Sequence, residues 1–571
     1  MKNKKRITIG VVVVLLALAA ILAVIMLKKF APNKTHMSLT KYFQVTDQGM
    51  MPVVLEDDIC GLKAIEKDGH IYVDREFVTE KLNHRFYWDA NENMLLYTTS
   101  TKLISAALNS KDCYINNKSR DSKDYTIAVA QDNVVYVALD YVQQYTAMDY
   151  KQYKKPNRIV IHTVYNKDIS YADAKDDVQI RNKQSIKSPI LQDVKSGQKL
   201  RVLAGENKDT GFMKVMSESG VIGYVQAKKM KETYKKQSET TFREESYSHI
   251  LMDKQVNLVW HQVTNQSANG RLSGLLSATK GVNVVAPTWF ETSDNDGNVT
   301  SLASDSYVQT AHQAGVQVWA LCSDFGPKMK IGKVLGTTSK RQKLVKNLIA
   351  EAIRYDLDGI NIDFENVKKD SGEDFIQFVR ELGIMCRNNG VVLSIDNYPP
   401  AGGISAYYNR KEQAEVADYV ITMSYDEHYA GSKEAGPVSS ISYVTNSIQE
   451  VGEEVPAEQM VIALPFYSRH WKEKTKGGKA KLSSEACSMK GAQTVLKDSG
   501  KKATWDDATG MNYVEYTESG TVHKIWIEDA KSLELKMKAV SDANLGGVAF
   551  WKLGLEDASV WNMIEKYVNC L

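Results

Sequence analysis

The sequence predicts a multidomain protein whose C-terminal part is a (β/α)8 barrel. Between residues 248 and 571, eight short apolar stretches recur at intervals that suit β/α units. Helical periodicity fills the gaps, as in residues 339–354 and 373–386, where the apolar side chains fall on one face. A chain of 571 residues is also too long for one hydrophobic core, so three or four domains are expected.

The barrel prediction places eight strands and one insertion. The strands are residues 256–263, 282–287, 316–321, 357–364, 391–396, 419–423, 460–466 and 547–551. A Lys-, Gly- and Ser-rich stretch, residues 472–524, is expected to be an insertion between the last two strands. In such barrels the chemistry lies at the C-terminal ends of the strands, so the residues there are the candidates for function.

The fourth strand alternates apolar and polar side chains. Because neighbouring residues of a strand point to opposite faces, one face is apolar and the other carries an amide and two carboxyls. The apolar residues are Ile360, Ile362 and Phe364, and the polar residues are Asn361, Asp363 and Glu365. A solvated edge strand is the alternative, but the helical patterns on both sides favour a central strand that lines an active site.

Other predicted strand ends also carry acids and aromatic residues. Tyr398 follows the fifth strand, residues 425–428 follow the sixth, Tyr467 follows the seventh, and Trp551 ends the eighth. Any one of these alone would be read as structural, and Trp551 could be a core residue. Together they predict a site built from several strand ends.

Four motifs in order resemble glycoside hydrolase family 18. Residues 358–365 resemble its DxxDxDxE signature, and residues 423–426, 464–467 and 546–551 resemble its sixth, seventh and eighth strands. Residues 425–431 are most similar to the spore-germination and cortex-lytic branch, whose N-acetylglucosaminidases cut bacterial wall glycans. The resemblance covers about residues 250–571.

The resemblance implies substrate-assisted, retaining catalysis without an enzymic nucleophile. Glu365 would protonate the glycosidic oxygen while the substrate's 2-acetamido oxygen attacks the anomeric carbon. Asp363 would hold the acetamido N–H and stabilise positive charge, and its own charge would raise the pKa of Glu365. Tyr425 would donate its hydroxyl to the acetamido oxygen. No cofactor and no metal are implied.

Five further residues are predicted to bind substrate. The resemblance assigns Asp426 to a sugar hydroxyl or the acetamido region and Trp551 to the floor of the subsite, and Tyr467 and Tyr398 are expected to line it. Asn361 stands where the family has its second Asp, so it is expected to support Asp363 by a hydrogen bond and to alter the pH dependence. Asp358 is expected on the opposite face of the strand from Asp363 and is interpreted as structural. His428 could equally form a structural hydrogen bond or contact the substrate.

The N-terminus carries a candidate membrane segment. Residues 2–6 include four basic side chains, an uncharged run covers residues 7–27, and Lys28 and Lys29 follow. About 20 apolar residues span a bilayer as a helix. Bulky residues end the run where a signal peptide would have a small-residue cleavage site, which favours an uncleaved anchor over residues 1–29. The basic flank weakly places the N-terminus in the cytoplasm and the rest of the chain outside, on the cell-wall side.

Two small domains are predicted between the anchor and the barrel. After a polar linker, residues 30–48, two segments of residues 49–165 repeat the order strand, short helix, strand at a spacing of 64 residues. These segments resemble the repeats of the copper amine oxidase N-terminal domain, but no copper ligands are evident. Residues 170–232 read as short strands with glycine turns and resemble a bacterial SH3-type β-barrel, which implies wall binding; a spacer is the alternative for either domain. Residues 231–247 are expected to be a second linker.

Charge and cysteine content exclude several classes of function. The net charge is +3, which argues against a nucleic-acid-binding protein, and the six cysteines contain no CxxC pair. A bridge between Cys60 and Cys113 is left open, and no oligomeric state is indicated. The function expected is a membrane-anchored glycosidase that cleaves β-1,4 bonds at N-acetylglucosamine in peptidoglycan or a chitin-like polymer. One alternative is a non-catalytic protein that binds the cell wall through the same barrel. The other is a wall-anchored scaffold in which the N-terminal repeats are the functional part.

Overall fold

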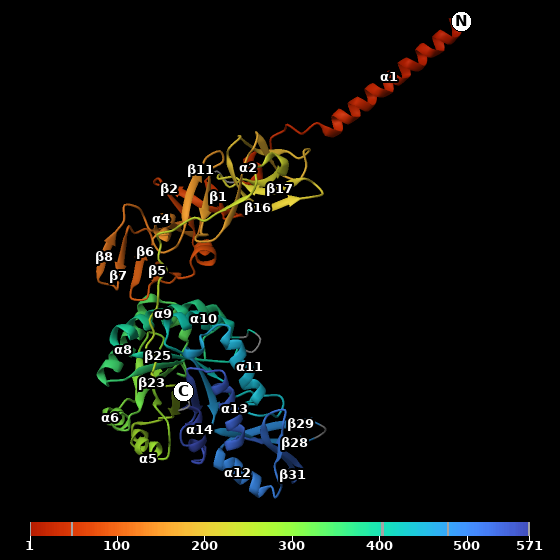
Figure 1. Ribbon diagram of the computed structural model, residues 1–571. Helices are drawn as coiled ribbons and strands as arrows, with labels where there is room; N and C mark the ends of the chain where they lie inside the picture. Colours follow the sequence, from red (N-terminus) through yellow and green to blue (C-terminus); the bar gives the residue numbers. More distant parts are fainter. Residues whose placement is uncertain (1, 47–48, 401–402, 404, 477–478, 569–571) are drawn as a thin grey trace. The chain divides into compact units, whose positions relative to one another are not determined.

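The computed structural model describes residues 2–46, 49–400, 403, 405–476 and 479–568 (Figure 1). The chain divides into two compact units. One contains residues 1–86, 106–113 and 121–244, and the other contains residues 87–105, 114–120 and 245–571. Each unit is described by itself below.

Eight parallel strands close into a barrel in the second unit (Figure 1). They are β20 (Val256–His261), β21 (Val284–Thr292), β23 (Gln317–Ser323), β24 (Gly359–Asp363), β25 (Val392–Asn397), β26 (Tyr419–Met423), β27 (Met460–Pro465) and β33 (Gly547–Trp551). Pairing of β20 with both β21 and β33 completes the circle. The eight strands match those expected from the sequence, so the barrel prediction is confirmed.

Helices form the outer layer of the barrel (Figure 1). They include α5 (Leu272–Leu276), α6 (Asp305–Gln313), α8 (Thr338–Arg354), α9 (Gly372–Asn389), α10 (Arg410–Val416), α11 (Ile441–Gly452), α13 (Ala530–Asp542) and α14 (Val560–Val568). The apolar face of β24 belongs to the core beneath these helices, where Ile360 and Ile362 are buried with Leu348 and Phe378. The polar face of β24 therefore points into the barrel. Gly359 opens this strand because a Cβ there would lie 2.6 Å from the ring of Trp319.

The predicted insertion forms a separate small sheet. Its strands are β28 (Tyr467–Lys476), β29 (Lys479–Ser488), β30 (Thr504–Asp506), β31 (Met511–Glu518) and β32 (Thr521–Ile527), with α12 (Met489–Asp498) packed against them. The strand order is β29-β28-β32-β31-β30. Because β28 begins at Tyr467, directly after β27 ends, the insertion starts at the mouth of the barrel.

The duplicated segment has the expected order of elements, although β5 and most of β4 are assigned to the second unit. The first copy runs through β3 (His70–Asp74), α3 (Arg75–Phe77), η1 (Val78–Leu82), β4 (Phe86–Asp89) and β5 (Met94–Thr98), and the second runs through β10 (Val134–Ala138), α4 (Leu139–Gln143), β11 (Asp149–Tyr153) and β12 (Arg158–His162). Strands β3 and β10 pair antiparallel, with Val73 opposite Val137. They share a seven-stranded sheet with β1 (Met50–Leu55), β2 (Asp58–Lys67) and β9 (Ala128–Gln131).

A second seven-stranded sheet covers the segment expected to be SH3-like. Its strands are β13 (Ile169–Asp173), β14 (Val178–Arg181), β15 (Ile190–Val194), β16 (Lys199–Asn207), β17 (Phe212–Met216), β18 (Ile222–Gln226) and β19 (Tyr234–Lys236). Strand β19 lies in the expected linker 231–247; it pairs with β13 through its backbone while its side chains stay exposed, so no burial pattern marks it. Phe43, in the expected linker 30–48, is buried in the same core as Val178 and Leu200.

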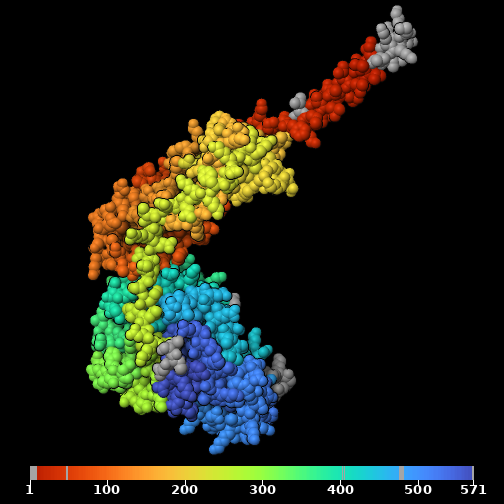
Figure 2. Space-filling model, viewed as in Figure 1, coloured from red at the N-terminus to blue at the C-terminus, as the bar shows by residue number. Residues whose placement is uncertain are grey.

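The N-terminal helix α1 (Lys2–Phe30) contains one segment, Ile9–Phe30, that is long and apolar enough to cross a membrane. None of its most apolar stretch is buried in the structure (Figure 2). Cys60 and Cys113 are free thiols, so the bridge that the sequence left open does not form. Cys570 lies outside the described residues.

Candidate active site

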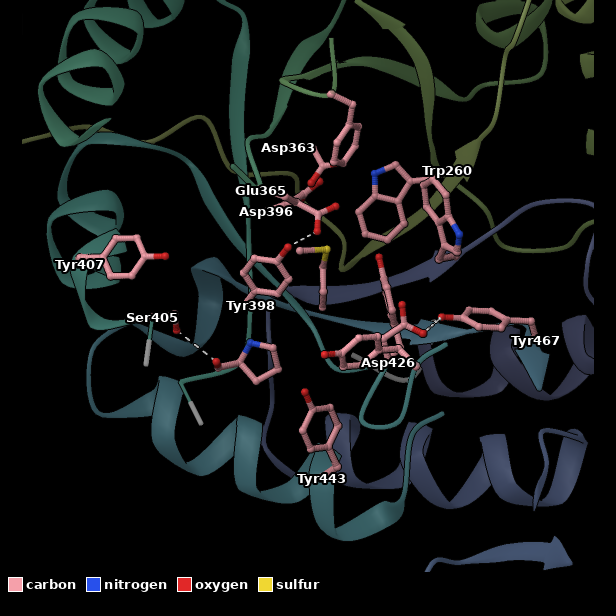
Figure 3. A pocket seen from close by; sticks show the side chains of 16 residues that line it. Trp260, Asp363, Glu365, Asp396, Tyr398, Ser405, Tyr407, Asp426, Tyr443 and Tyr467 are labelled. Carbon is pink, nitrogen blue, oxygen red and sulfur yellow. Dashed lines mark hydrogen bonds between the residues drawn. The ribbon is translucent and has the colours of Figure 1, made fainter. Parts of the chain in front are cut away.

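A cavity of about 760 Å³ lies at the C-terminal ends of the barrel strands (Figure 3). Seven of the eight residues predicted for the site line it: Asp363, Glu365, Tyr398, Tyr425, Asp426, Tyr467 and Trp551. The rest of the lining is largely aromatic, with Trp260, Phe325, Tyr407, Tyr429 and Tyr443, and also includes Asp396, Pro399, Ser405 and Met423. An acidic cavity with aromatic walls matches what sugar rings need, since their C–H faces stack on aromatic rings while carboxyls receive their hydroxyls.

Glu365 lies two residues after the end of β24, and two neighbours fix its position. The carboxylate of Asp324 accepts the backbone N–H groups of Glu365, at 3.0 Å, and Asn366, at 2.9 Å. The hydroxyl of Tyr398 donates a hydrogen bond to Oε2 of Glu365 (Figure 3). Burial raises the pKa of Glu365, the charges of Asp324 and Asp426 act in the same direction, and the hydrogen bond from Tyr398 opposes them. The carboxyl is therefore held nearer to the protonated form that a general acid requires.

Asp363 is the last residue of β24 and is only 7% exposed. Burial raises the pKa of its carboxyl well above the usual value, and the charges of Asp396, Glu365 and Asp324 add to that effect. Its Oδ1 atom is buried and has no hydrogen-bond partner among the described residues. An acceptor left without a donor in a buried position is unfavourable by about 1–3 kcal/mol, so this atom calls for a donor that the protein or a ligand supplies.

Asn361 does not line the cavity, and it does not form the hydrogen bond to Asp363 that the sequence analysis expected. It lies one layer deeper on the same face of β24 and is fully buried. Its amide nitrogen donates to Ser394 Oγ at 3.0 Å and to Asp396 Oδ1 at 2.8 Å, whereas no hydrogen bond to Asp363 is formed. The indole N–H of Trp260 donates to the amide oxygen at 2.9 Å, which fixes the orientation of the amide because tryptophan is only a donor. Asn361 therefore supports Asp396 rather than Asp363 or a substrate.

The opposite wall of the cavity is built after β26 and β27. The hydroxyl of Tyr467 donates to Asp426 Oδ1 at 2.5 Å, and this bond orients the carboxylate (Figure 3). Asp426 has a φ of 55°, in the left-handed region that Asp tolerates better than most residues. The rings of Tyr425 and Tyr467 meet edge to face with their centroids 6.4 Å apart. Burial raises the pKa of Tyr425, so its hydroxyl keeps its proton and remains a donor.

Trp551 and Trp260 form the floor between these two walls. Trp551 ends β33 and is partly exposed to the cavity, whereas Trp260 is 1% exposed, and their ring centroids are 5.9 Å apart. This position suits a ring that receives a sugar on its outer face. His428, in contrast, is bonded to the carbonyl of Pro437 at 3.1 Å, which is a structural contact.

Sequence reasoning missed two acids. Asp396 lines the cavity from β25, where the alternation of Leu393 and Ile395 with Ser394 and Asp396 is the signal that could have found it. Asp324 follows β23 directly, so it too occupies a strand end. Both are almost fully buried. Together with Asp363 and Glu365 they make a cluster of carboxyls that can hold a proton at neutral pH, which is the requirement for acid catalysis without a metal.

Comparison with known proteins agrees with this geometry. Residues 326–556 match the family model "Glycosyl hydrolases family 18". The barrel domain belongs to this family. Residues 60–161 match the model "Copper amine oxidase N-terminal domain", which covers most of the duplicated segment.

Proteins similar to this domain include a cortical fragment-lytic enzyme, a spore cortex-lytic enzyme and a chitinase. The chain is 25% identical over 248 residues to the cortical fragment-lytic enzyme of Bacillus subtilis (strain 168), covering 42% of this chain and 57% of that enzyme. It is 21% identical over 359 residues to chitinase B of Serratia marcescens, covering 48% and 72% of the two chains. The crystal structure of the Bacillus cereus spore cortex-lytic enzyme SleL matches with a TM-score of 0.50 at 20% identity, covering 55% of this chain and 74% of that one. The chain thus spans little more than half the length of the cortical fragment-lytic enzyme.

Proposed function

We propose that this protein hydrolyses β-1,4 bonds at N-acetylglucosamine in bacterial peptidoglycan by substrate-assisted, retaining catalysis. The single observation that carries the proposal is the pair of cavity carboxyls Asp363, at the end of β24, and Glu365, two residues later, both without a cationic partner among the residues described. A glycosidase of this type needs one acid and one carboxylate that supports the acetamido group, and the pair supplies both.

The proposed mechanism assigns each group by its position. Glu365, with a raised pKa, protonates the glycosidic oxygen as the bond to the anomeric carbon breaks. The acetamido oxygen of the substrate attacks that carbon, and Asp363 accepts the acetamido N–H and stabilises the positive charge of the oxazolinium ion. Tyr425 donates to the acetamido oxygen before attack, while Asp426, oriented by Tyr467, binds a sugar hydroxyl.

Water then completes the reaction. After the leaving sugar departs, Glu365 is ionised and can remove a proton from water, which attacks the anomeric carbon and reopens the ring of the intermediate. The acetamido oxygen and then water attack the anomeric carbon from opposite faces, so two successive inversions leave the configuration retained. Trp551 would stack on the apolar face of the ring and hold it during both steps.

We propose peptidoglycan rather than chitin as the substrate because of the segments that precede the barrel in the sequence. The helix Ile9–Phe30 suits a membrane anchor with the bulk of the chain on the wall side, and the sheet β13–β19 is proposed to be an SH3-like, wall-binding module. The relatives named for activity on spore cortex support the same preference.

The test uses the full chain in detergent micelles. Purified peptidoglycan and an N-acetylchitooligosaccharide are incubated with the protein and with Glu365→Gln, and the products are analysed by mass spectrometry. The proposal predicts new reducing-end N-acetylglucosamine from peptidoglycan, at rates that the variant does not reach. Wall fragments released equally by both proteins, or by neither, would refute it.

A further inference from the structure

Two carboxyls occupy neighbouring positions on adjacent strands beneath Glu365. The parallel register of β24 and β25 places Asn361 beside Ser394 and Ile362 beside Ile395, so Asp363 and Asp396 form the next pair. Adjacent strands lie about 4.8 Å apart. Both side chains line the same cavity, and their exposed fractions are only 7% and 3% (Figure 3).

The hydrogen bonds around this pair are unequal. Asp396 Oδ1 accepts the amide N–H of Asn361 at 2.8 Å, and the orientation of that amide is fixed by Trp260. Asp363 Oδ1 is buried and has no donor among the described residues. A protonated carboxyl on the neighbouring strand would provide that donor, since its O–H can point at the atom that lacks a partner.

Asp363 and Asp396 are too close and too buried for both carboxyls to be ionised at once. Like charges at the spacing of neighbouring strands oppose ionisation, and neither residue forms an ion pair with Lys or Arg in the described part of the chain. Titration of one such carboxyl is then coupled to that of the other, so the pair carries one proton over a wide pH range.

We propose that Asp363 and Asp396 share one proton, and that Asp396 is a positioning residue for the reaction. This inference rests on the proposed function. When the proton lies on Asp396, its O–H donates to Asp363 Oδ1, and Asp363 is a carboxylate whose second oxygen accepts the acetamido N–H. The proton moves only between two carboxyl oxygens, and no other species is consumed. Asp396 thus keeps Asp363 ionised and aimed at the substrate.

Burial and mutual charge support this assignment. Burial raises the pKa of Asp396 well above its usual value, and the charge of Glu365 adds to the effect. The other titratable groups that interact with the pair or with Glu365 in the described part of the chain are Asp324, Asp426, Tyr398, Tyr408, Tyr425, Tyr467 and Cys322.

Three variants of the full chain test the proposal on an N-acetylchitooligosaccharide. Asp396→Leu removes both the shared proton and the O–H donor to Asp363, and the double variant Asn361→Asp, Asp396→Leu returns a carboxyl one layer deeper, on the same face of β24 as Asp363. Asp418→Asn is the control; that carboxyl is also buried, but it accepts the backbone N–H groups of Ile250 and Leu393 at the other end of the barrel. Values of kcat and KM are measured against pH, and folding is checked by thermal unfolding.

The proposal predicts that Asp396→Leu lowers kcat about tenfold with little change in KM. It also moves the acidic limb of the pH profile to higher pH, because Asp363 must be ionised and loses the O–H that stabilised its carboxylate. The double variant restores kcat to within about threefold of the original chain and moves the limb back. The control loses stability but keeps the original pH profile.

Other results would overturn the proposal. An Asp396→Leu chain with an unchanged kcat and pH profile would do so, and so would a folded double variant that recovers neither. If Asp396→Leu does not fold, infrared spectroscopy of the unaltered chain at neutral pH must show a protonated carboxyl whose band Asp363→Asn shifts or removes, and a band that is absent or unaltered refutes the pair. A chain that hydrolyses no acetamido sugar contradicts the proposed function instead, while the infrared result still decides whether the proton is shared.

Discussion

Two sets of buried carboxyls in the barrel domain differ in whether a cation lies beside them. In the helical layer each buried carboxylate has a cation: Arg341 Nε lies 2.9 Å from Glu381 Oε1, Arg380 Nε lies 2.8 Å from Glu412 Oε1, and Lys536 pairs with Glu528. In the cavity, Asp363, Glu365 and Asp396 have no such partner among the residues described.

The difference separates stability from chemistry. A buried charge that only supports the fold must be paired or, like Asp418, held by backbone N–H groups, because its desolvation is costly. Carboxyls left unpaired at neighbouring positions have raised pKa values and retain protons, which costs stability but supplies an acid. The predictions below test this division, in order of decreasing effect.

Replacing Glu365 by Gln should have the largest effect on turnover. An amide fills the same space but cannot supply a proton, so kcat should fall by about 10²- to 10⁴-fold with the fold intact. The measurement is the release of reducing ends from an N-acetylchitooligosaccharide. Asp358→Asn is the matched control from the other end of the same strand; Asp358 Oδ2 accepts the backbone N–H of Val318 at 2.8 Å, and its loss should leave kcat unchanged. Equal rates for Glu365→Gln and the original chain would contradict the assignment.

Removing the cation of a paired carboxyl should affect stability alone. Lys536→Met leaves Glu528 buried without its partner, which should cost about 3–5 kcal/mol of unfolding free energy. Chemical denaturation measures the loss, and kcat per folded molecule should not change. The double variant Lys536→Met, Glu528→Leu should recover most of the stability, since neither charge then remains. A stable single variant would show that the pairing is unimportant.

Asp363→Asn should slow the reaction by about 10²-fold, because an amide cannot stabilise the positive charge of the intermediate. Stability should be unchanged or higher, since a buried carboxyl with an unpartnered oxygen is removed. The two quantities are read from steady-state kinetics and from thermal unfolding. Loss of stability together with full activity would place Asp363 among the structural carboxyls.

Tyr398→Phe should change kcat least of these variants and should shift the pH profile in one direction. The hydroxyl of Tyr398 lowers the pKa of Glu365, so its removal raises that pKa. Glu365 must be protonated to act, and a higher pKa keeps it protonated to higher pH. The alkaline limb of kcat/KM should therefore move to higher pH, with kcat changed by only a few-fold. A shift to lower pH would mean that Tyr398 acts on another group.

The sequence was sufficient for the barrel and for most of the cavity. Period-two alternation on β24 places Asp363 and Glu365 inward, and strand ends meet at one rim, so Tyr425, Tyr467 and Trp551 come together. It could not give the hydrogen bonds of Asn361, because these depend on the register between β24 and β25 and on Trp260 from β20. Similarly, Phe43 and β19 are held by contacts with distant strands that a local pattern does not reveal.

The most direct test of the account concerns the acetamido group of the substrate. The rate of hydrolysis is compared for an N-acetylchitooligosaccharide and for the cello-oligosaccharide of the same length, which has the same linkage with a hydroxyl in place of the acetamido group. The account predicts cleavage of the first and, for the second, a rate no higher than that of Glu365→Gln. Equal rates on both sugars would contradict it, because the cavity would then be supplying a nucleophile of its own.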